Sequence, residues 1–232
     1  MTKINTKAVI NDGFNSELVE TAFFDGILEM PIVAAPKEIV IPTRLLPFSK
    51  RGCSRDFSET LVTYEPDVKF REILVAPERF VEEFRRFRSG IVTLDSSLYW
   101  DMPLLAQMAN TYRNRAIGCY YQRQGIPVIT NVRWGDERSY TTKFLPEPFA
   151  FLGAPRHSIV AIGTYGCIRG REAEFQMISG LEAMLLYLQP EIVLVYGSMP
   201  ERIFRRFAGF ARFVHYPDWI TLQKGGAGHG ND

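Results

Sequence analysis

Two apolar stretches of this sequence are followed by side chains that can take part in catalysis or ligand binding. Asp95 comes directly after residues 91–94, and residues 128–132 are followed by Arg133, Trp134, Asp136 and Glu137. Carboxylates from two loops can bind a divalent metal or act as general acid and base, so Asp95, Asp136 and Glu137 are candidate catalytic residues. The alternative for the second loop is a solvated turn. A tryptophan among polar and charged residues, however, is costly to expose without a partner surface, which favours a function.

The candidate ligand-binding residues lie in these loops and at neighbouring strand ends. We expect Arg133 to hold phosphate and Trp134 to stack on a base. The turn at residues 163–167 could offer backbone N–H groups to a phosphate, although it matches neither GxxxxGK[ST] nor GxGxxG. Cys167 in this turn would need a nearby base to act as a nucleophile, so we expect a buried structural cysteine. Further candidates are Asn131, Thr164, Gly166 and Gly197.

The segment from Pro103 to about residue 124 has the pattern of a long helix and carries a third group of candidates. Asn110, Arg113 and Asn114 would share one helical side, where a guanidinium with two amides could bind phosphate or carboxylate. The alternative is an ordinary solvated face. The opposite, apolar side should face the core, and it comprises Leu105, Met108, Ala109, Tyr112 and Ala116.

Six short apolar runs must supply the strands that position these loops. They are rich in β-branched residues and nearly unbroken, as is typical of strands covered on both faces, and they span residues 73–75, 91–94, 128–132, 159–162, 192–196 and 212–216. Helical patterns lie between them. Strands and helices in alternation predict a parallel sheet, in which the loops at the carboxyl ends of strands meet at one edge. The candidate residues should therefore lie together.

The predicted fold class is α/β, with a mostly parallel sheet and helices on both faces. Six strands are too few for an eight-stranded barrel unless the runs around Ile39 and Leu61 add two more, so we expect an open three-layer fold, with barrel-like closure as the alternative. Prolines divide residues 1–60, which we interpret as an irregular N-terminal extension packed on the core. The core domain would span residues 61–222, and the glycine-rich residues 223–232 would form a flexible tail.

The composition excludes several classes of protein. The chain has 232 residues, 46% of them hydrophobic, which is enough for a sizeable core. Its 27 basic and 26 acidic side chains create no global field that favours nucleic acid or an anionic membrane. The three cysteines lack the spacing of a disulfide framework or a zinc site. Because we find no secretory signal and no membrane-spanning apolar run, we expect a cytoplasmic protein without a membrane partner.

Several ordered blocks of the sequence resemble those of a known family. They are GIVTLDSSLYWDMP at 90–103, NTYRNRAIG at 110–118, GIPVITNVRWGDERSY at 125–140, SIVAIGTYGC at 158–167 and VYGSMP at 195–200. The chain is similar, over residues 40–217, to the family catalogued as domain of unknown function 4417, which occurs in bacteria, phages and other mobile elements. The resemblance implies a phage or mobile-element context and brings no established activity. Where that family has a histidine in the fourth block, this chain has Tyr165, which weakens the case for an essential metal ligand or base there.

Two classes of function remain open. The first is an enzyme that processes a nucleotide or nucleic acid at the carboxyl ends of the parallel strands, with a divalent metal as a candidate cofactor. The second is a non-catalytic binding protein, an accessory or counter-defence factor that recognises a nucleic acid, a nucleotide or a host protein through the same groove. Convergent polar groups favour the enzyme. The absence of a known catalytic signature in the sequence favours the binding protein.

Overall fold

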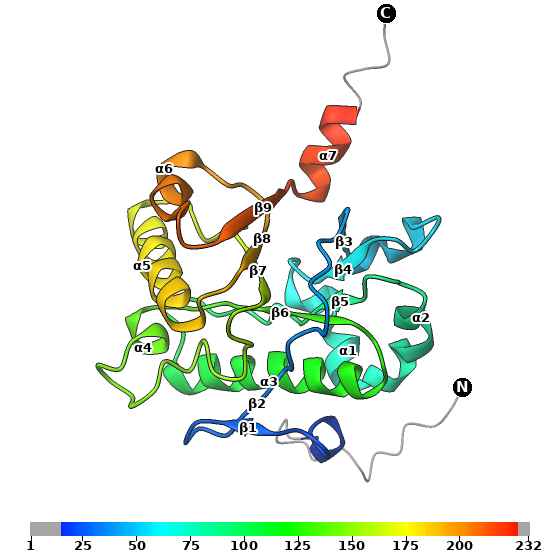
Figure 1. Cartoon of the computed structure of the whole chain (residues 1–232), viewed down its shortest axis with the longest axis horizontal. Helices are drawn as coiled ribbons and strands as arrows, with labels where there is room; N and C mark the ends of the chain where they lie inside the picture. The colour runs from blue at the N-terminus through cyan, green and yellow to red at the C-terminus, as the bar shows by residue number, and fades with distance from the viewer. Residues whose placement is uncertain (1–14, 227–232) are drawn as a thin grey trace, which may run out of the picture.

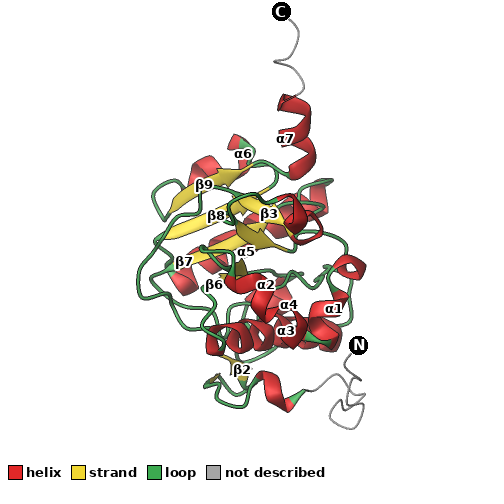
Figure 2. Ribbon diagram, turned by 90° about the vertical axis from the view of Figure 1, so that its right-hand side faces the viewer, coloured by secondary structure: helices red, strands yellow, loops and turns green. Residues whose placement is uncertain are grey.

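Seven strands form one sheet, in the order in which they occur along the chain. The computed structural model describes residues 15–226. Every neighbouring pair in this sheet is parallel, and Figure 2 shows β6 to β9 side by side. The strands are β3 (Leu45–Pro47), β4 (Thr60–Val62), β5 (Ile91–Val92), β6 (Val128–Asn131), β7 (Ile159–Gly163), β8 (Ile192–Tyr196) and β9 (Arg212–Tyr216).

The helices between these strands lie on the convex side of a sheet that curls into a half-barrel. A strand order that follows the chain sends each right-handed crossover to the same side, and Figure 1 shows α3 and α5 outside the curl. The helices are α1 (Arg71–Val75), α2 (Val81–Arg85), α3 (Leu104–Arg123), α4 (Glu137–Tyr140), α5 (Arg171–Leu188), α6 (Glu201–Phe204) and α7 (Trp219–Gly226). Short 3₁₀ helices span Ser16–Leu18, Phe48–Cys53, Asp67–Lys69, Pro77–Phe80 and Arg205–Phe207.

Hydrophobic clusters fill both faces of the half-barrel. On the convex face, Ile117 of α3 and Leu181 of α5 are fully buried against alternate strand residues. On the concave face, strand side chains such as Ile129 and Leu194 pack together, with Ile39 beside them. The α/β class and the mostly parallel sheet are confirmed, and the sheet curls as in the barrel-like alternative. The core of the concave face comes from strand side chains rather than from a second helix layer.

The strands predicted around residues 91–94, 128–132, 159–162, 192–196 and 212–216 are confirmed, but the run at residues 73–75 is not a strand. It lies in α1, where Ile73 is buried, as is Phe70 just before the helix, while Val75 is 51% exposed. A run of three apolar residues fits one helical turn as well as a strand, so periodicity alone could not separate the two. Leu61 does lie in a strand, β4, whereas Ile39 precedes the first strand of the sheet.

Part of the predicted N-terminal extension belongs to the sheet. β3 forms one edge, where Pro47 is tolerated because an edge strand has an unpaired side. Before it, β1 (Phe24–Asp25) and β2 (Met30–Pro31) form an antiparallel hairpin. At the other end, α7 takes in residues 223–226 of the predicted tail, and residues 227–232 lie outside the described part.

The hairpin is fastened to the core at Gly153. The Gly153 N–H donates to the Asp25 carboxylate at 2.9 Å, and its carbonyl accepts from Val33 N–H at 2.9 Å. Gly153 has a φ of +68°, and a Cβ there would lie 2.2 Å from the Pro31 carbonyl oxygen. Only glycine fits this contact without moving the hairpin.

Helix α3 turns a face to the core that differs from the predicted one. Its buried residues include the polar side chains of Gln107, Thr111, Asn114 and Arg115, whereas Leu105 is 78% exposed. Ala116 is buried as predicted, and Met108 and Tyr112 are only partly buried. The helix packs over strand ends and loops whose backbone groups need hydrogen-bond partners, so polar satisfaction rather than apolar periodicity decides which face is buried.

Candidate functional site

A pocket of about 250 Å³ opens at the carboxyl ends of β4, β5, β6 and β7. The loops after these strands form most of its walls, and the start of α5 closes one side. Its lining includes Tyr64, Asp95, Tyr99, Arg133, Trp134 and Tyr165. Parallel α/β folds bind ligands at this edge because loops from several strands converge there. The pocket is therefore the first candidate for a functional site.

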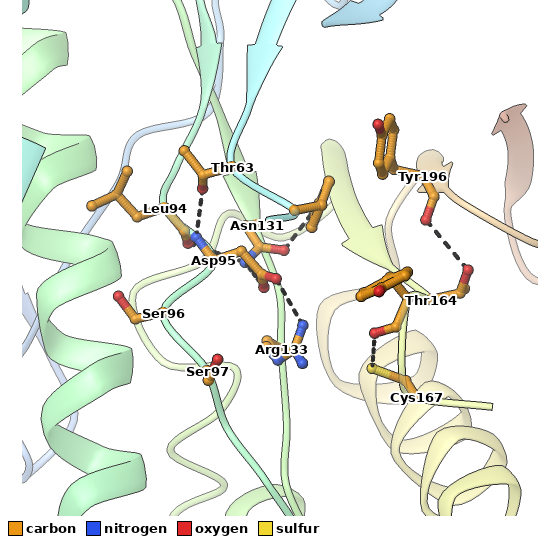
Figure 3. Close-up of polar contacts among 12 residues, drawn as sticks. Thr63, Leu94, Asp95, Ser96, Ser97, Asn131, Arg133, Thr164, Cys167 and Tyr196 are labelled. Atoms are coloured by element: carbon orange, nitrogen blue, oxygen red, sulfur yellow. Dashed lines mark hydrogen bonds and ion pairs between the residues drawn. The ribbon is translucent and has the colours of Figure 1, made fainter. Parts of the chain in front are cut away.

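The Asp95 carboxylate is buried in the wall of this pocket, with both oxygens engaged. Its Oδ2 accepts from Arg133 Nη1 at 2.7 Å and its Oδ1 from Asn131 Nδ2 at 2.9 Å, while the Asp95 N–H donates to Thr63 Oγ1 at 2.8 Å (Figure 3). Burial raises the pKa of Asp95 above its ordinary value, and the Arg133 charge limits the rise. These contacts hold the carboxylate in one position.

The Arg133 guanidinium pairs with Asp95, and both residues line the pocket. The Arg133 side chain is 14% exposed and that of Asp95 9%, so the ion pair is largely removed from water. Burial alone would lower the pKa of Arg133, but the Asp95 charge raises it above its ordinary value. Its Nε is buried and has no hydrogen-bond partner within residues 15–226. A buried donor on a permanent charge is costly to leave unpaired, and a ligand in the pocket can supply the acceptor.

Asn131 links three strands beneath Asp95. Its N–H donates to Thr93 Oγ1 at 2.8 Å, and its Oδ1 accepts from the Tyr64 hydroxyl at 3.0 Å. The Tyr64 ring stacks on Tyr196, with 5.3 Å between ring centroids. The ends of β4, β5, β6 and β8 therefore belong to one connected network, which fixes the geometry of the pocket wall.

Arg115 of α3 supports this network from below. It is fully buried and donates to the carbonyls of Leu152 at 2.9 Å, Asn131 at 2.7 Å and Ala150 at 2.9 Å. Burial lowers its pKa to about 10. We did not predict a role for Arg115, because an arginine in a polar helical segment is usually solvated. Its acceptors are the carbonyls of residues that meet the helix only in the folded chain, so no sequence pattern marked it.

Trp134 is part of the pocket wall and is packed from behind. It is 8% exposed, its Nε1 donates to the Gln176 carbonyl at 2.9 Å, and its ring meets Phe151 edge-on at 6.5 Å. A Cβ on Gly180 of α5 would lie 2.1 Å from the indole nitrogen. Only the part of the indole that faces the pocket is open to a base.

The loops after β7 and β8 are joined to each other at the edge of the site. Thr164 Oγ1 donates to the Ser198 carbonyl at 2.7 Å, and a Cβ on Gly197 would lie 2.7 Å from that hydroxyl. Gly166 and Cys167 line the pocket, whereas its lining does not include Thr164 or Gly197. Burial raises the pKa of the Cys167 thiol, which favours the protonated form over a nucleophilic thiolate.

Asp136 and Glu137 lie apart from Asp95, in a second, more open depression of about 600 Å³ between α4 and α5. Asp136 caps α4, accepting from the Arg138 N–H at 3.1 Å, and forms an ion pair with the Arg138 guanidinium at 2.8 Å. Glu137 pairs with Lys143 at 2.7 Å. The chain enters α4 directly after Gly135, which carries both carboxylates away from the pocket. Within residues 15–226, no group of three or more His, Cys, Asp or Glu side chains could hold a metal ion.

The polar residues of α3 fasten the loop after β5. Asn114 Oδ1 accepts from Ser96 N–H at 3.1 Å, and Asn110 Nδ2 donates to the Ser97 carbonyl at 2.7 Å. Arg113 Nη1 donates to Asn110 Oδ1 at 3.0 Å. The pocket lining includes none of these three side chains of α3, so they position the loop that carries Asp95.

Three aromatic side chains at the mouth of the pocket were not among our candidates. They lie in the loops after β5 and β7, and their exposed fractions are 54% for Tyr99, 50% for Trp100 and 64% for Tyr165. The sequence signal was a Tyr-Trp pair directly after a polar run that follows a buried strand.

Comparisons with known proteins place this chain among phage-associated proteins of unknown function. It is 32% identical to Gene 1 protein of Mycobacterium phage L5 over 57% of this chain and 55% of that protein. It is 31% identical to Gene 1 protein of Mycobacterium phage D29 over 57% of this chain and 46% of that protein. The matches thus span about half the length of these relatives. No solved structure matches the chain.

A search of the described helices for one that is both long and apolar enough to cross a membrane finds none. The family model described as "Domain of unknown function (DUF4417)" matches residues 22–217. These residues contain the whole seven-stranded sheet and every residue of the pocket lining named above. The chain therefore belongs to this family of domains of unknown function.

Proposed function

We propose that the pocket binds one nucleotide unit, either free or within a nucleic acid, and that Arg133 is the anchor for its phosphate. The single observation that carries this proposal is the buried Arg133 Nε without a hydrogen-bond partner among the described residues. Asp95 occupies Nη1 and fixes the plane of the guanidinium. The Nε edge remains for a second anion, and a guanidinium edge fits two phosphate oxygens.

The size and lining of the pocket support a nucleotide unit. Its volume of about 250 Å³ lies just below the ~300–1,000 Å³ typical of ligand pockets, which suits one nucleotide better than a dinucleotide cofactor. Tyr64, Tyr99, Trp134 and Tyr165 contribute aromatic surface beside the arginine. Aromatic faces bind bases by stacking, while the guanidinium binds the phosphate.

The contacts of Asp95 favour recognition over acid–base catalysis. A general base needs an oxygen within reach of the substrate proton, but both Asp95 oxygens accept hydrogen bonds from Asn131 and Arg133. Asp136 and Glu137 line the other depression. We therefore assign Asp95 a positioning role, and the non-catalytic hypothesis becomes the better supported of the two classes.

Thermal denaturation with a panel of small ligands tests this proposal. The panel comprises the four nucleoside 5′-monophosphates, the matching nucleosides and inorganic phosphate. At about one hundred times its Kd, a ligand of the folded state adds about 2.7 kcal/mol to the free energy of unfolding. We expect a raised Tm with at least one monophosphate and a smaller shift with its nucleoside.

Arg133→Lys is the variant for the anchor, because it keeps a positive charge beside Asp95 and removes the planar fork. We expect it to fold and to lose most of the monophosphate shift. Arg79→Lys is the matched control, because Arg79 is exposed and lies outside the pocket lining, and it should keep the shift. Equal shifts in Arg133→Lys and the native protein, or no shift with any monophosphate or oligonucleotide, would contradict the proposal.

A further inference from the structure

We infer that the nucleotide in the pocket is one link of a single-stranded nucleic acid, whose neighbouring nucleotides lie over the loop between β7 and α5. This inference rests on the proposed function and extends it from a nucleotide unit to a polymer. It starts from surface that a mononucleotide in the pocket would leave uncovered.

The uncovered surface is aromatic and belongs to two loops. Tyr99 and Trp100 follow β5, Tyr165 follows β7, and all three line the pocket while being at least 50% exposed. Clustered exposed rings at a pocket mouth mark an interaction site. Bases adjacent to the bound nucleotide can stack on such rings without sequence preference. In a duplex the paired and stacked base could not enter the pocket, which favours a single strand.

The charges of the β7–α5 loop agree with a polyanion. Arg169 and Arg171 are exposed and form no ion pair within residues 15–226. The acidic side chains nearest in sequence already have partners. Glu174 is paired with Arg202 at 2.8 Å, and Glu172 accepts a hydrogen bond from a glutamine side chain at 2.7 Å. Two guanidinium groups without an ion pair lie four and six residues after Tyr165 along the chain, where they can contact phosphates of the same strand.

The second depression, which shares Trp100 with the pocket, is the less suitable path. Its lining includes Asp136, Glu137 and Glu182, and the first two are neutralised by Arg138 and Lys143. No basic side chain remains unpaired in that lining to attract phosphate. The strand should therefore follow the β7–α5 loop and avoid the depression.

To test whether the ligand is a polymer, we would compare the affinities of a fluorescein-labelled oligothymidylate of about ten nucleotides and of thymidine 5′-monophosphate. We expect the oligonucleotide to bind at least tenfold more tightly. Tyr165→Ala should weaken oligonucleotide binding about tenfold, which corresponds to the loss of one stacked base. Because Tyr165 also lines the pocket, it should weaken monophosphate binding as well, but by a smaller factor. Phe23→Ala is the matched control, since Phe23 is 81% exposed on the N-terminal hairpin side of the molecule.

The double variant Arg169→Gln, Arg171→Gln tests the phosphate path through salt dependence. Each lost phosphate contact should reduce the slope of log K against log salt concentration by about 0.7, so we expect a slope shallower by roughly 1.4. Arg71→Gln, Arg79→Gln changes the net charge equally on an exposed surface outside the pocket lining and should leave the slope unchanged.

The outcomes separate the two proposals. Equal affinities for the monophosphate and the oligonucleotide, or loop variants without effect on the oligonucleotide, would overturn the polymer and leave the proposed function standing. An equal reduction of the salt slope with Arg71→Gln, Arg79→Gln would also overturn the proposed course of the strand over the β7–α5 loop, because net charge alone would then explain the reduction. Failure of the oligonucleotide and of all four monophosphates to bind would overturn the proposed function itself.

Discussion

At the scale of single residues, the Asp95–Arg133 pair decides how the candidate site is understood. From the sequence we expected Arg133 only to hold phosphate. The structure instead buries most of both side chains and places them 2.7 Å apart. Removing one partner leaves the other charge unpaired in a region that water reaches poorly. Arg133 therefore carries both a binding role and a structural one.

We expect Asp95→Ala and Arg133→Ala each to lower the free energy of unfolding by about 3–5 kcal/mol. The double variant should lose much less than the sum, because it leaves neither charge unpaired. Chemical denaturation of the four proteins of this cycle measures the coupling. Additive losses would show that the two side chains act independently and would remove the basis for treating them as one unit.

The cost of Arg133→Ala should also depend on pH. Burial already raises the pKa of Asp95 in the folded protein, and loss of the Arg133 charge should raise it further. A carboxyl with a raised folded pKa contributes stability that is present below its unfolded pKa and is lost as pH rises through the folded value. The stability loss caused by Arg133→Ala should therefore be smaller near pH 4 than at pH 7. A loss that stays constant over this range would mean that Asp95 does not titrate there.

At the scale of elements, α3 shows where apolar periodicity succeeds and where it fails. The start near Pro103 and the end before Gly125 agree with the structure, and Gly125 has the φ of +75° of a glycine that follows a helix end. The buried face does not agree, because Asn114 and Arg115 bind backbone groups of loops that are distant in sequence. Which polar residues a helix buries depends on where unsatisfied carbonyls and N–H groups lie in three dimensions, and one sequence does not contain that information.

Two truncations in α3 test this revised orientation. Ile117 is fully buried in the core, whereas Met108 is only partly buried and packs on a smaller cluster below the site. Ile117→Ala should cost about 2–5 kcal/mol, and Met108→Ala should cost clearly less. Urea denaturation of both variants gives the comparison. A larger loss for Met108→Ala would restore the face that periodicity predicted.

At the scale of the whole molecule, alternation of strands and helices was enough to predict the edge at which the pocket lies. Asp95 and Arg133 end neighbouring strands of a parallel sheet, so their proximity follows from the fold class. The curl into a half-barrel was harder to predict, because β3 and β4 are only three residues long and β3 follows a segment interrupted by Pro31, Pro36 and Pro42. The separation of Asp136 from Asp95 could not be predicted either, since it depends on where α4 begins.

Side-chain contacts connect the two edges of the half-barrel, β3 and β9, and their strength determines how rigidly the half-barrel is held. We call this set of contacts the seam. Tyr216 at the end of β9 donates its hydroxyl proton to the Pro42 carbonyl at 2.5 Å, and the Arg44 guanidinium lies 5.3 Å from the centroid of the Trp219 ring. Both contacts join β9 and α7 to the chain just before β3. No strand pairing connects the two edges, and the apolar cluster that contains Leu45 of β3 and Val214 of β9 adds to these two contacts.

We expect Tyr216→Phe to loosen this seam without unfolding the protein. Tyr216 is 8% exposed, so the phenyl ring keeps its packing while the Pro42 carbonyl loses its donor, at a cost of about 1 kcal/mol. Amide hydrogen exchange should then accelerate by roughly fivefold in β3 and β9 together, because opening the seam releases both edges. Exchange in β6 and β7, at the centre of the sheet, should stay as it is in the native protein. Acceleration in β9 alone would show that the edges open independently, and unchanged exchange in both would show that the hydroxyl contact does not hold the seam.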